Sequence, residues 1–278
     1  MRLTAALSIV LALSAGQAVA QTLERIADTG EIRLGVRADA APMSYVGADG
    51  EPTGFAVGVC NSIVDLLGQS MGQEITPVPV IVSAADRFNA VAEGRVDLLC
   101  GAATITLERR EIVDFSIPTF VDGAAVLLRE GSDPEFSALA GKKIGVRADT
   151  TTETVLRNSI ANAGMEAEVT AIDSHEGAVA ALTGGEIDAY FADQSILFAL
   201  YFAAEDSSAL VVSENTLTVE KQGLALMRGD SDFRLEVDRA VSAIYATGRM
   251  REIFEANLPG ATPGAALQAL RLIAPELP

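Results

Sequence analysis

The feature that most limits the fold of this chain is a pattern of short apolar runs and helical stripes that occurs twice. Such alternation is typical of βαβ units around a parallel sheet. Two phrases recur in the same order: Gly-Val-Arg-Ala-Asp stands at 35–39 and at 145–149, and Gly-Arg-Val-Asp at 94–97 is echoed by Gly-Glu-Ile-Asp at 185–188. Because a solenoid needs at least three copies at a short period, the duplication predicts two α/β modules.

The periodicity of the apolar residues assigns the individual elements. Strands are expected over residues 31–36, 75–82, 96–101, 143–147, 168–172 and 187–192, with a further β-like segment over 216–228. Helices are expected over 56–67, 84–93, 150–163, 175–182, 233–254 with a break near Gly248, and 265–272. Both modules then present the carboxyl ends of their strands, where open α/β sheets bind ligands.

The chain is expected to cross between the modules twice. It leaves the first near Phe120 and returns near Leu217, so the two crossings predict a hinge. We therefore expect lobe 1 to comprise residues 21–120 and 218–278 and lobe 2 to comprise residues 121–217, with crossings near 119–123 and 215–221. A cleft between the lobes is the expected binding site.

The first twenty residues predict export. A positive start at Arg2, an apolar run and an Ala-Val-Ala site ending at Ala20 are typical of a signal peptide over residues 1–20. The apolar run is shorter than the ~20 residues that a membrane span needs. In an oxidising compartment Cys60 and Cys100 are a disulfide candidate, and two buried free thiols are the alternative.

Composition and motifs exclude several classes of function. The formal net charge of −18 at pH 7 opposes binding to nucleic acid, because neutralising phosphates needs clustered Lys and Arg. The sequence contains no recognisable nucleophile, dinucleotide, phosphate-binding or zinc motif, so we predict no enzyme, no metal and no cofactor. The single histidine, His175, is interpreted as a solvated residue at a helix start.

Polar residues at the expected strand ends favour ligand binding instead. Arg109 follows the strand that ends at Gly101, and its guanidinium suits a carboxylate. The alternative for Arg109 is a surface ion pair with Glu108 or Glu111.

The second module offers complementary groups. Thr150 and Glu153 fit a capping box, and the same helix start offers free N–H groups to an anion. Asp193 ends the strand 187–192, where its carboxylate suits either an ammonium group or the cap of the following helix. A carboxylate site that faces an ammonium site across a cleft describes an amino-acid pocket.

The chain resembles the periplasmic amino-acid-binding proteins of ABC importers, solute-binding protein family 3, over nearly its whole mature length. The resemblance rests on residues 94–101, 105–110 (Ile-Thr-Leu-Glu-Arg-Arg), 114–116 (Asp-Phe-Ser), 141–146, 150–153, 185–193, and Thr-Gly at 247–248 before Phe254. It implies the type II fold of that family, in which two α/β lobes joined by a two-strand hinge close on a ligand and dock on a membrane permease.

The resemblance also implies roles for residues of the cleft. The arginine that matches Arg109 binds the ligand's α-carboxylate in that family, with positions that match Thr104 and Thr151. The acid that matches Asp193 binds the α-ammonium group, with backbone groups near Ala102.

The sequence is most similar to the glutamate/aspartate-binding branch of that family. Arginines of that branch match Arg37 and Arg87, and both would face an acidic ligand side chain; Arg37 has the alternative of pairing with Asp39. Three positions depart from the family pattern and leave room for a larger or a different polar ligand: Ala40 in place of a stacking aromatic residue, Met43 in place of phenylalanine, and Ser174 in place of a histidine.

The sequence therefore predicts a monomeric periplasmic binding protein. It would capture a polar, acidic L-amino acid by hinge closure and deliver it to the permease of an ABC importer. Two alternatives stay open: a periplasmic cyclohexadienyl or arogenate-type dehydratase on the same fold, and a ligand-sensing module. The dehydratase would need a general acid in the cleft, for which His175 and unpaired carboxylates are the candidates.

Overall fold

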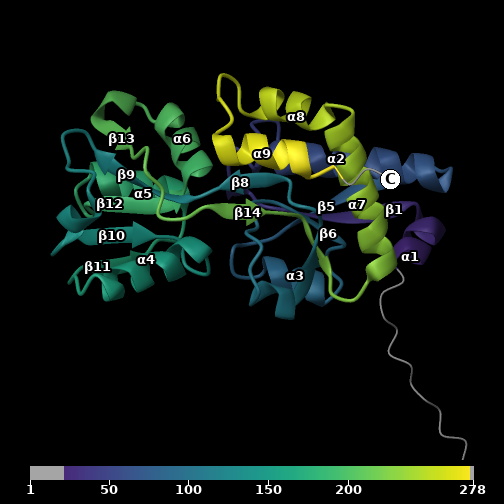
Figure 1. Ribbon diagram of the computed structural model, residues 1–278, viewed down its shortest axis with the longest axis horizontal. Coiled ribbons are helices and arrows are strands. Elements are labelled where there is room, and N and C mark those ends of the chain that lie inside the picture. The colour runs from purple at the N-terminus through teal and green to yellow at the C-terminus, as the bar shows by residue number, and fades with distance from the viewer. Residues whose placement is uncertain (1–21, 276–278) are drawn as a thin grey trace, which may run out of the picture.

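Two mixed sheets of five strands organise the computed structural model, which describes residues 22–275 (Figure 1). The first sheet consists, in spatial order, of β5 (Thr76–Ile81), β1 (Glu31–Val36), β6 (Leu98–Cys100), β15 (Ala225–Met227) and β7 (Val113–Phe115). The second consists of β11 (Glu168–Ala171), β10 (Lys143–Val146), β12 (Ala189–Asp193), β9 (Ala124–Arg129) and β13 (Leu210–Val212). The predicted signal peptide lies outside the described residues.

The two sheets repeat one topology. In the first, β1 pairs in parallel with β5 and β6, and the antiparallel β15 follows. In the second, β10 pairs in parallel with β11 and β12, and the antiparallel β9 follows. The duplication seen in the sequence is therefore a duplication of the sheet, and the predicted α/β fold of two lobes is confirmed.

Helices pack on both faces of each sheet. The first sheet carries α1 (Thr22–Thr29), α2 (Phe55–Met71), α3 (Arg87–Ala92), α7 (Ser231–Ala246), α8 (Arg249–Asn257) and α9 (Ala265–Ile273). The second carries α4 (Thr151–Asn162), α5 (His175–Thr183) and α6 (Gln194–Ala203). Short 3-10 turns occur at Arg109–Glu111, Phe136–Leu139 and Ser207–Ala209. In the described part of the chain, no helix combines the length and apolar character of a membrane span.

Successive residues of a strand point to opposite faces, so a central strand contributes to two cores. In β6, Leu98 and Cys100 join the core formed with α2, whereas Leu99 joins the core formed with α3. All three side chains are fully buried. This burial on both faces explains why the strand has a continuous apolar sequence rather than an alternating one.

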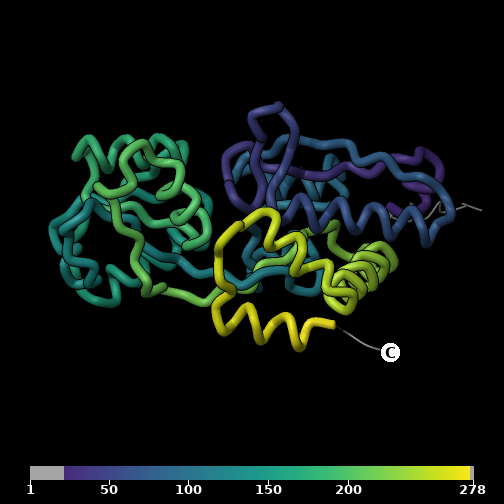
Figure 2. Tube along the Cα trace, turned by 90° about the horizontal axis from the view of Figure 1, so that it is seen from above, coloured from purple at the N-terminus to yellow at the C-terminus, as the bar shows by residue number. Residues whose placement is uncertain are grey.

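Two short antiparallel strands, β8 (Phe120–Asp122) and β14 (Glu220–Gln222), join the lobes (Figure 2). Gly123 follows β8, and a Cβ atom placed on it would lie 2.2 Å from the carbonyl oxygen of Thr218. The two crossing segments therefore approach so closely that only glycine fits. The helix α9 lies against β8, and its Leu267 and Leu270 join the core of the first sheet.

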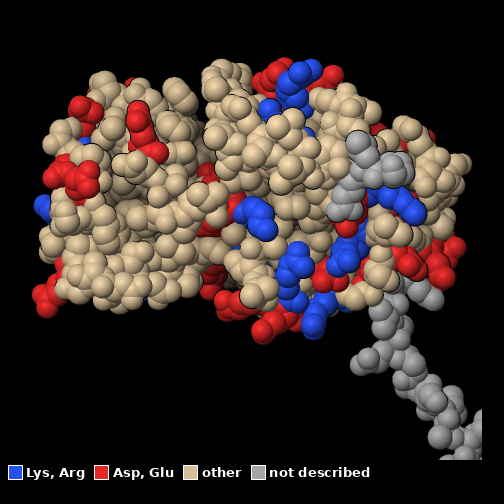
Figure 3. Space-filling view, in the orientation of Figure 1, with Lys and Arg blue, Asp and Glu red and all other residues tan. Residues whose placement is uncertain are grey.

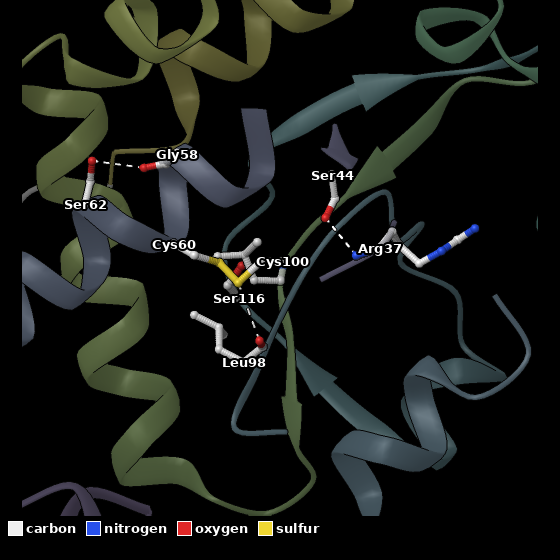
Figure 4. Close-up of a disulfide and its surroundings, with 9 residues drawn as sticks. Arg37, Ser44, Gly58, Cys60, Ser62, Leu98, Cys100 and Ser116 are labelled. Carbon is white, nitrogen blue, oxygen red and sulfur yellow. Dashed lines mark hydrogen bonds between the residues drawn. A yellow bond between two sulfur atoms is a disulfide. The ribbon is translucent and has the colours of Figure 1, made fainter. Parts of the chain in front are cut away.

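A small sheet of β2 (Asp39–Ala40), β3 (Ser44–Val46) and β4 (Pro52–Thr53) continues from β1. The hydroxyl of Ser44 accepts a hydrogen bond of 2.9 Å from the backbone N–H of Arg37 (Figure 4). This contact fixes the chain just beyond the end of β1.

Cys60 of α2 and Cys100 of β6 form a disulfide with a Cα–Cα distance of 6.1 Å (Figure 4). The predicted pairing is confirmed, and the alternative of two free thiols is wrong. The bridge ties α2 to the strand that leads into the cleft, and the Arg37 side chain points away from it.

The helix α3 is shorter than its predicted range, since it begins at Arg87 rather than at residue 84. The Ser83 hydroxyl accepts a hydrogen bond from the backbone N–H of Asp86, which holds the preceding residues in a turn. The shortened helix places Arg87 in its first turn.

Candidate functional site

One cavity between the lobes collects every residue that the sequence analysis assigned to ligand binding. Its lining includes Arg37, Arg87, Ala102, Thr104, Arg109, Thr151 and Asp193. Arg37 follows β1, and Ala102, Thr104 and Arg109 follow β6. Arg87 begins α3, Thr151 begins α4 just after β10, and Asp193 ends β12. The cavity therefore lies at the carboxyl ends of the parallel strands of both sheets, as expected for open α/β folds.

Arg87 is a buried cation with unused hydrogen-bond donors. Its side chain is only 3% exposed, and one nitrogen, Nη2, donates 3.2 Å to the backbone carbonyl of Asp149 across the cleft. Its Nε and Nη1 atoms find no acceptor within residues 22–275. Burial, together with the positive charges of Arg109 and Arg37, lowers the pKa of Arg87 to about 9. An anion in the cavity would relieve both the charge repulsion and the missing hydrogen bonds.

Arg109 stacks on the same ring as Arg87. The two guanidinium carbons lie 4.7 and 4.6 Å from the centroid of Phe88. Arg109 also donates 2.8 Å to the carbonyl of Thr104, and burial lowers its pKa. In the described structure Arg109 makes no ion pair with either neighbouring glutamate, so the surface alternative is wrong.

The alternative raised for Arg37 is confirmed, because Nη2 of this arginine lies 2.5 Å from Oδ1 of Asp39. The other oxygen of Asp39 lies 2.8 Å from Nη2 of Arg147, which follows β10 in the second lobe. Asp39 therefore links the two copies of the Gly-Val-Arg-Ala-Asp phrase across the cleft. The Nε atom of Arg37 and the Nη1 atom of Arg147 are buried without an acceptor among residues 22–275.

Asp193 occupies the N-cap position of α6, as the alternative predicted, but its side chain makes no capping hydrogen bond to that helix. Its carboxylate instead accepts hydrogen bonds from Gln222 Nε2 at 2.7 Å and from Thr152 Oγ1 at 3.4 Å. Burial, and then the like charges of Asp122 and Glu220, raise the pKa of Asp193 to about 8. A cation beside this carboxylate would favour its ionised form.

Two threonine hydroxyls from different lobes meet at one carboxylate of the hinge. Thr104 Oγ1 donates 2.6 Å and Thr151 Oγ1 donates 2.9 Å to the same oxygen of Glu220, a residue of β14. The hydroxyl oxygens of these two threonines are 3.4 Å apart. Each hydroxyl has a single hydrogen, so an anion that enters between the lobes would have to replace Glu220 as the acceptor of these two bonds.

The predicted cap of α4 is confirmed in one direction. Thr150 accepts a hydrogen bond from the backbone N–H of Glu153, which leaves the N-terminus of α4 at the cavity. The Glu153 side chain accepts from the N–H of Asp149 rather than from that of Thr150.

The interpretation of His175 as a solvated residue is wrong. The side chain is only 6% exposed, and its Nδ1 atom lies 2.7 Å from the hydroxyl of Tyr190 in β12. Burial and the positive charge of Arg147 lower the pKa of His175 to about 4, so the ring is neutral at pH 7. The first turn of α5 faces the sheet, which its sequence does not reveal.

Sequence analysis missed several residues in or beside the cavity: Arg147, Thr152, Glu220 and Gln222. The internal repeat is a signal that identifies Arg147, because it occupies in the second copy the place of Arg37 in the first. Glu220 and Gln222 have no comparable signal, since only the pairing of β14 with β8 brings them to the cleft.

A second, wider groove of about 900 Å³ lies beside the hinge strands. Its lining includes Phe198, Phe202, Val219 and the segment 257–267, and among the described residues no Lys, Arg or His side chain lines it. Figure 3 shows a notch between the lobes that is bordered mostly by uncharged residues. This groove lacks a counter-charge for a carboxylate, and within residues 22–275 no cluster of acidic, His or Cys side chains suits a metal ion.

Comparison with known proteins agrees with this geometry. Residues 32–259 match the family model described as bacterial extracellular solute-binding proteins, family 3. An L-glutamate/L-aspartate-binding protein of Pseudomonas aeruginosa is 29% identical over 89% of this chain and 84% of its own length. An L-cystine-binding protein of Escherichia coli K12 is 26% identical over 89% of this chain and 91% of its own length. An ancestral arginine-binding protein with bound arginine superimposes with a TM-score of 0.75 at 25% identity, covering 82% of this chain and 98% of that one.

Proposed function

Because this chain belongs to the bacterial extracellular solute-binding proteins of family 3, we propose that it captures an acidic L-amino acid between its lobes for an ABC importer. The names of the relatives support the amino-acid class, since they bind glutamate and aspartate, cystine, or arginine. These relatives also differ in their ligands, so the choice of an acidic side chain depends on the cavity itself.

The observation that carries the acidic specificity is the unsatisfied buried guanidinium of Arg87. A buried cation without an anionic partner destabilises the protein, and an acidic side chain would supply that partner. A neutral ligand side chain could accept a hydrogen bond but would leave the charge uncompensated. A basic side chain would add to the repulsion among the arginines of the cavity.

The remaining groups suit the amino-acid head. We assign the α-carboxylate to Arg109 with the hydroxyls of Thr104 and Thr151, and the α-ammonium group to Asp193 with the backbone near Ala102. Arg37 and Arg87 then lie on the side of the ligand's acidic group. This assignment uses charge-assisted hydrogen bonds at both ends of the ligand.

Hinge closure follows from the division of these groups between the lobes. Arg109 and Thr104 follow β6 of the first sheet, whereas Thr151 and Asp193 adjoin β10 and β12 of the second. Only a closed cleft can satisfy both ends of one amino acid, so the ligand binds the closed state more tightly and shifts the population toward it. We expect the closed lobes to dock on a membrane permease after export to the periplasm.

The test is a thermal unfolding screen of the refolded, ligand-stripped protein against the twenty L-amino acids. Glutamate or aspartate at a hundredfold excess over Kd should stabilise the protein by about 2.7 kcal/mol. Arg109→Ala should abolish the shift for both ligands, and Arg239→Ala, an exposed arginine of α7, is the matched control.

The other outcomes of the screen are decisive as well. A shift produced only by neutral or basic amino acids would contradict the acidic specificity while preserving the amino-acid function. An absence of any shift, with a folded protein, would contradict the proposed function as a whole.

A further inference from the structure

Asp39 occupies an unusual position between two arginines of different lobes. Its Oδ1 atom lies 2.5 Å from Nη2 of Arg37 in its own lobe, and its Oδ2 atom lies 2.8 Å from Nη2 of Arg147 in the opposite lobe. The two guanidinium groups are largely buried, with exposed side-chain fractions of 6% and 11%, whereas the Asp39 side chain is 32% exposed at the rim. One carboxylate thus serves two buried cations at the edge of the cavity.

The cavity is lined by several arginines, so the negative charge of Asp39 affects the net charge that a ligand meets there. Arg37, Arg87 and Arg147 all line the cavity and all keep a buried nitrogen without an acceptor in the described structure. His175, a titratable group that also interacts with Arg147, is neutral at pH 7 and adds no charge. Partial burial would raise the pKa of Asp39, but the charges of Arg37 and Arg147 outweigh it and lower that pKa, so the carboxylate is ionised.

We propose that Asp39 is a specificity-determining residue that limits how strongly the cavity prefers an acidic over a neutral ligand side chain. The inference rests on the proposed function, because it concerns the choice among amino acids bound at this site. Asp39 neutralises part of the positive charge that a ligand carboxylate would otherwise meet. Its presence therefore narrows the difference in affinity between an acidic amino acid and its neutral amide.

The ion pair between Asp39 and Arg147 also joins the two lobes, so removing the Asp39 carboxylate has two physical effects. Loss of the Asp39–Arg147 contact weakens closure, and this penalty is equal for any ligand that closes the cleft in the same way. Loss of the negative charge strengthens attraction for an anionic side chain alone. In the ratio of the affinities for an acidic and a neutral ligand, the penalty on closure cancels. The change in this ratio therefore measures the change in attraction for the anionic side chain.

The experiment measures Kd for L-glutamate and L-glutamine by titration calorimetry in the wild-type protein and in Asp39→Asn. We expect the ratio of the glutamine Kd to the glutamate Kd to rise about tenfold in the variant, allowing for the partial exposure of Asp39. Asp28→Asn removes the same charge from an exposed site on α1 and should leave the ratio unchanged.

Combined variants separate charge from local damage. Asp39→Ser should raise the ratio as Asp39→Asn does, and thermal unfolding will verify that both variants fold. Adding Arg147→Gln to Asp39→Asn removes one charge of each sign and should return the ratio toward the wild-type value. A ratio that stays within about twofold of wild type in both single variants would overturn the proposal. If the wild-type protein binds neither ligand, the same titrations are made with L-aspartate and L-asparagine. Binding of none of the four would contradict the proposed acidic specificity instead, so the two failures are distinguishable.

Discussion

The amide of Gln222 donates a hydrogen bond of 2.7 Å to the carboxylate of Asp193. Gln222 belongs to the hinge strand β14, and Asp193 ends β12 in the second lobe. The side-chain oxygen of Gln222 is buried without a donor within residues 22–275. The hinge thus directly contacts the carboxylate that we assign to the ligand's ammonium group, which links the position of the hinge to the protonation and occupancy of that carboxylate.

Ligand affinity should depend on pH through Asp193. Its pKa of about 8 in the free protein falls when an ammonium group lies beside it, so binding below pH 8 must release a proton. Affinity should therefore increase from pH 6 to pH 8, by at most tenfold per pH unit, and then level off. Titration calorimetry in buffers of different ionisation enthalpy measures the released proton. Asp193→Asn should bind more weakly and without this pH dependence; equal affinities of the wild type at pH 6 and 8 would contradict the assignment.

Replacing Arg87 should separate function from stability. Arg87→Met replaces the guanidinium side chain with an unbranched apolar one. It removes a buried charge that has no anionic partner in the described structure. We expect the free energy of unfolding of the ligand-free variant to stay constant or rise by about 1 kcal/mol, while acidic ligands no longer stabilise it. Urea unfolding with and without L-glutamate measures both effects. A large loss of stability without ligand would instead assign Arg87 a structural role.

Acid should destabilise the protein through His175. The pKa of this buried ring is lowered to about 4 in the folded state, against about 6.5 in the unfolded chain. Between these values the unfolded state binds the extra proton, so stability is complete above pH 6.5 and declines as pH falls toward 4, by up to about 1.4 kcal/mol per unit. Urea unfolding at pH 7 and pH 5 should show a smaller decline in His175→Asn than in the wild type. Parallel declines would contradict the prediction.

The disulfide should contribute substantially to stability. Cys60 and Cys100 are 40 residues apart in sequence, and the chain-entropy model assigns a loop of this length about 4 kcal/mol. The double variant Cys60→Ala/Cys100→Ala should lose most of this free energy of unfolding in urea, and reduction of the wild type with dithiothreitol should reproduce the loss. A loss below about 1 kcal/mol would show that the bridge adds little to the helix–strand packing.

The hinge should not tolerate a side chain at Gly123. In Gly123→Ala, the new methyl group would meet the carbonyl oxygen of Thr218, so the crossing segments must separate. We expect the free energy of unfolding, measured by thermal unfolding, to fall by about 1–3 kcal/mol and the Kd for the ligand to rise. Gly264→Ala, where no atom of residues 22–275 lies within 4 Å of the added methyl, is the matched control. Wild-type stability and affinity in Gly123→Ala would indicate that the hinge relaxes freely.

The fold was accessible from sequence where the pattern is local. The sequence predicts β1 over its observed bounds and α7 and α8 as one amphipathic run with a break at Gly248. It does not separate the segment 216–228 into β14, which pairs in the hinge, and β15, which pairs in the first sheet. That division depends on partners distant in the chain, which no local periodicity records.

The residues of the cavity were also predictable from sequence only where a local pattern or the family resemblance identifies them. Strand ends indicate Arg109 and Asp193, and the resemblance to a family adds Arg87, which lies in the first turn of α3. The burial of His175 against Tyr190 was not predictable, because it depends on how α5 packs on β12. The partnership of Asp39 with Arg147 is likewise a property of the two lobes together.

The position of β15 has a consequence for how the chain is assembled. This strand lies between β6 and β7 in the first sheet, yet it follows all five strands of the second sheet in sequence. The second sheet is one continuous stretch, whereas the first is interrupted by it. A polypeptide that emerges amino end first can therefore complete the second sheet while the first still lacks an inner strand. The lobe that begins first is therefore the lobe that is completed last, because its inner strand β15 follows the whole second sheet in sequence.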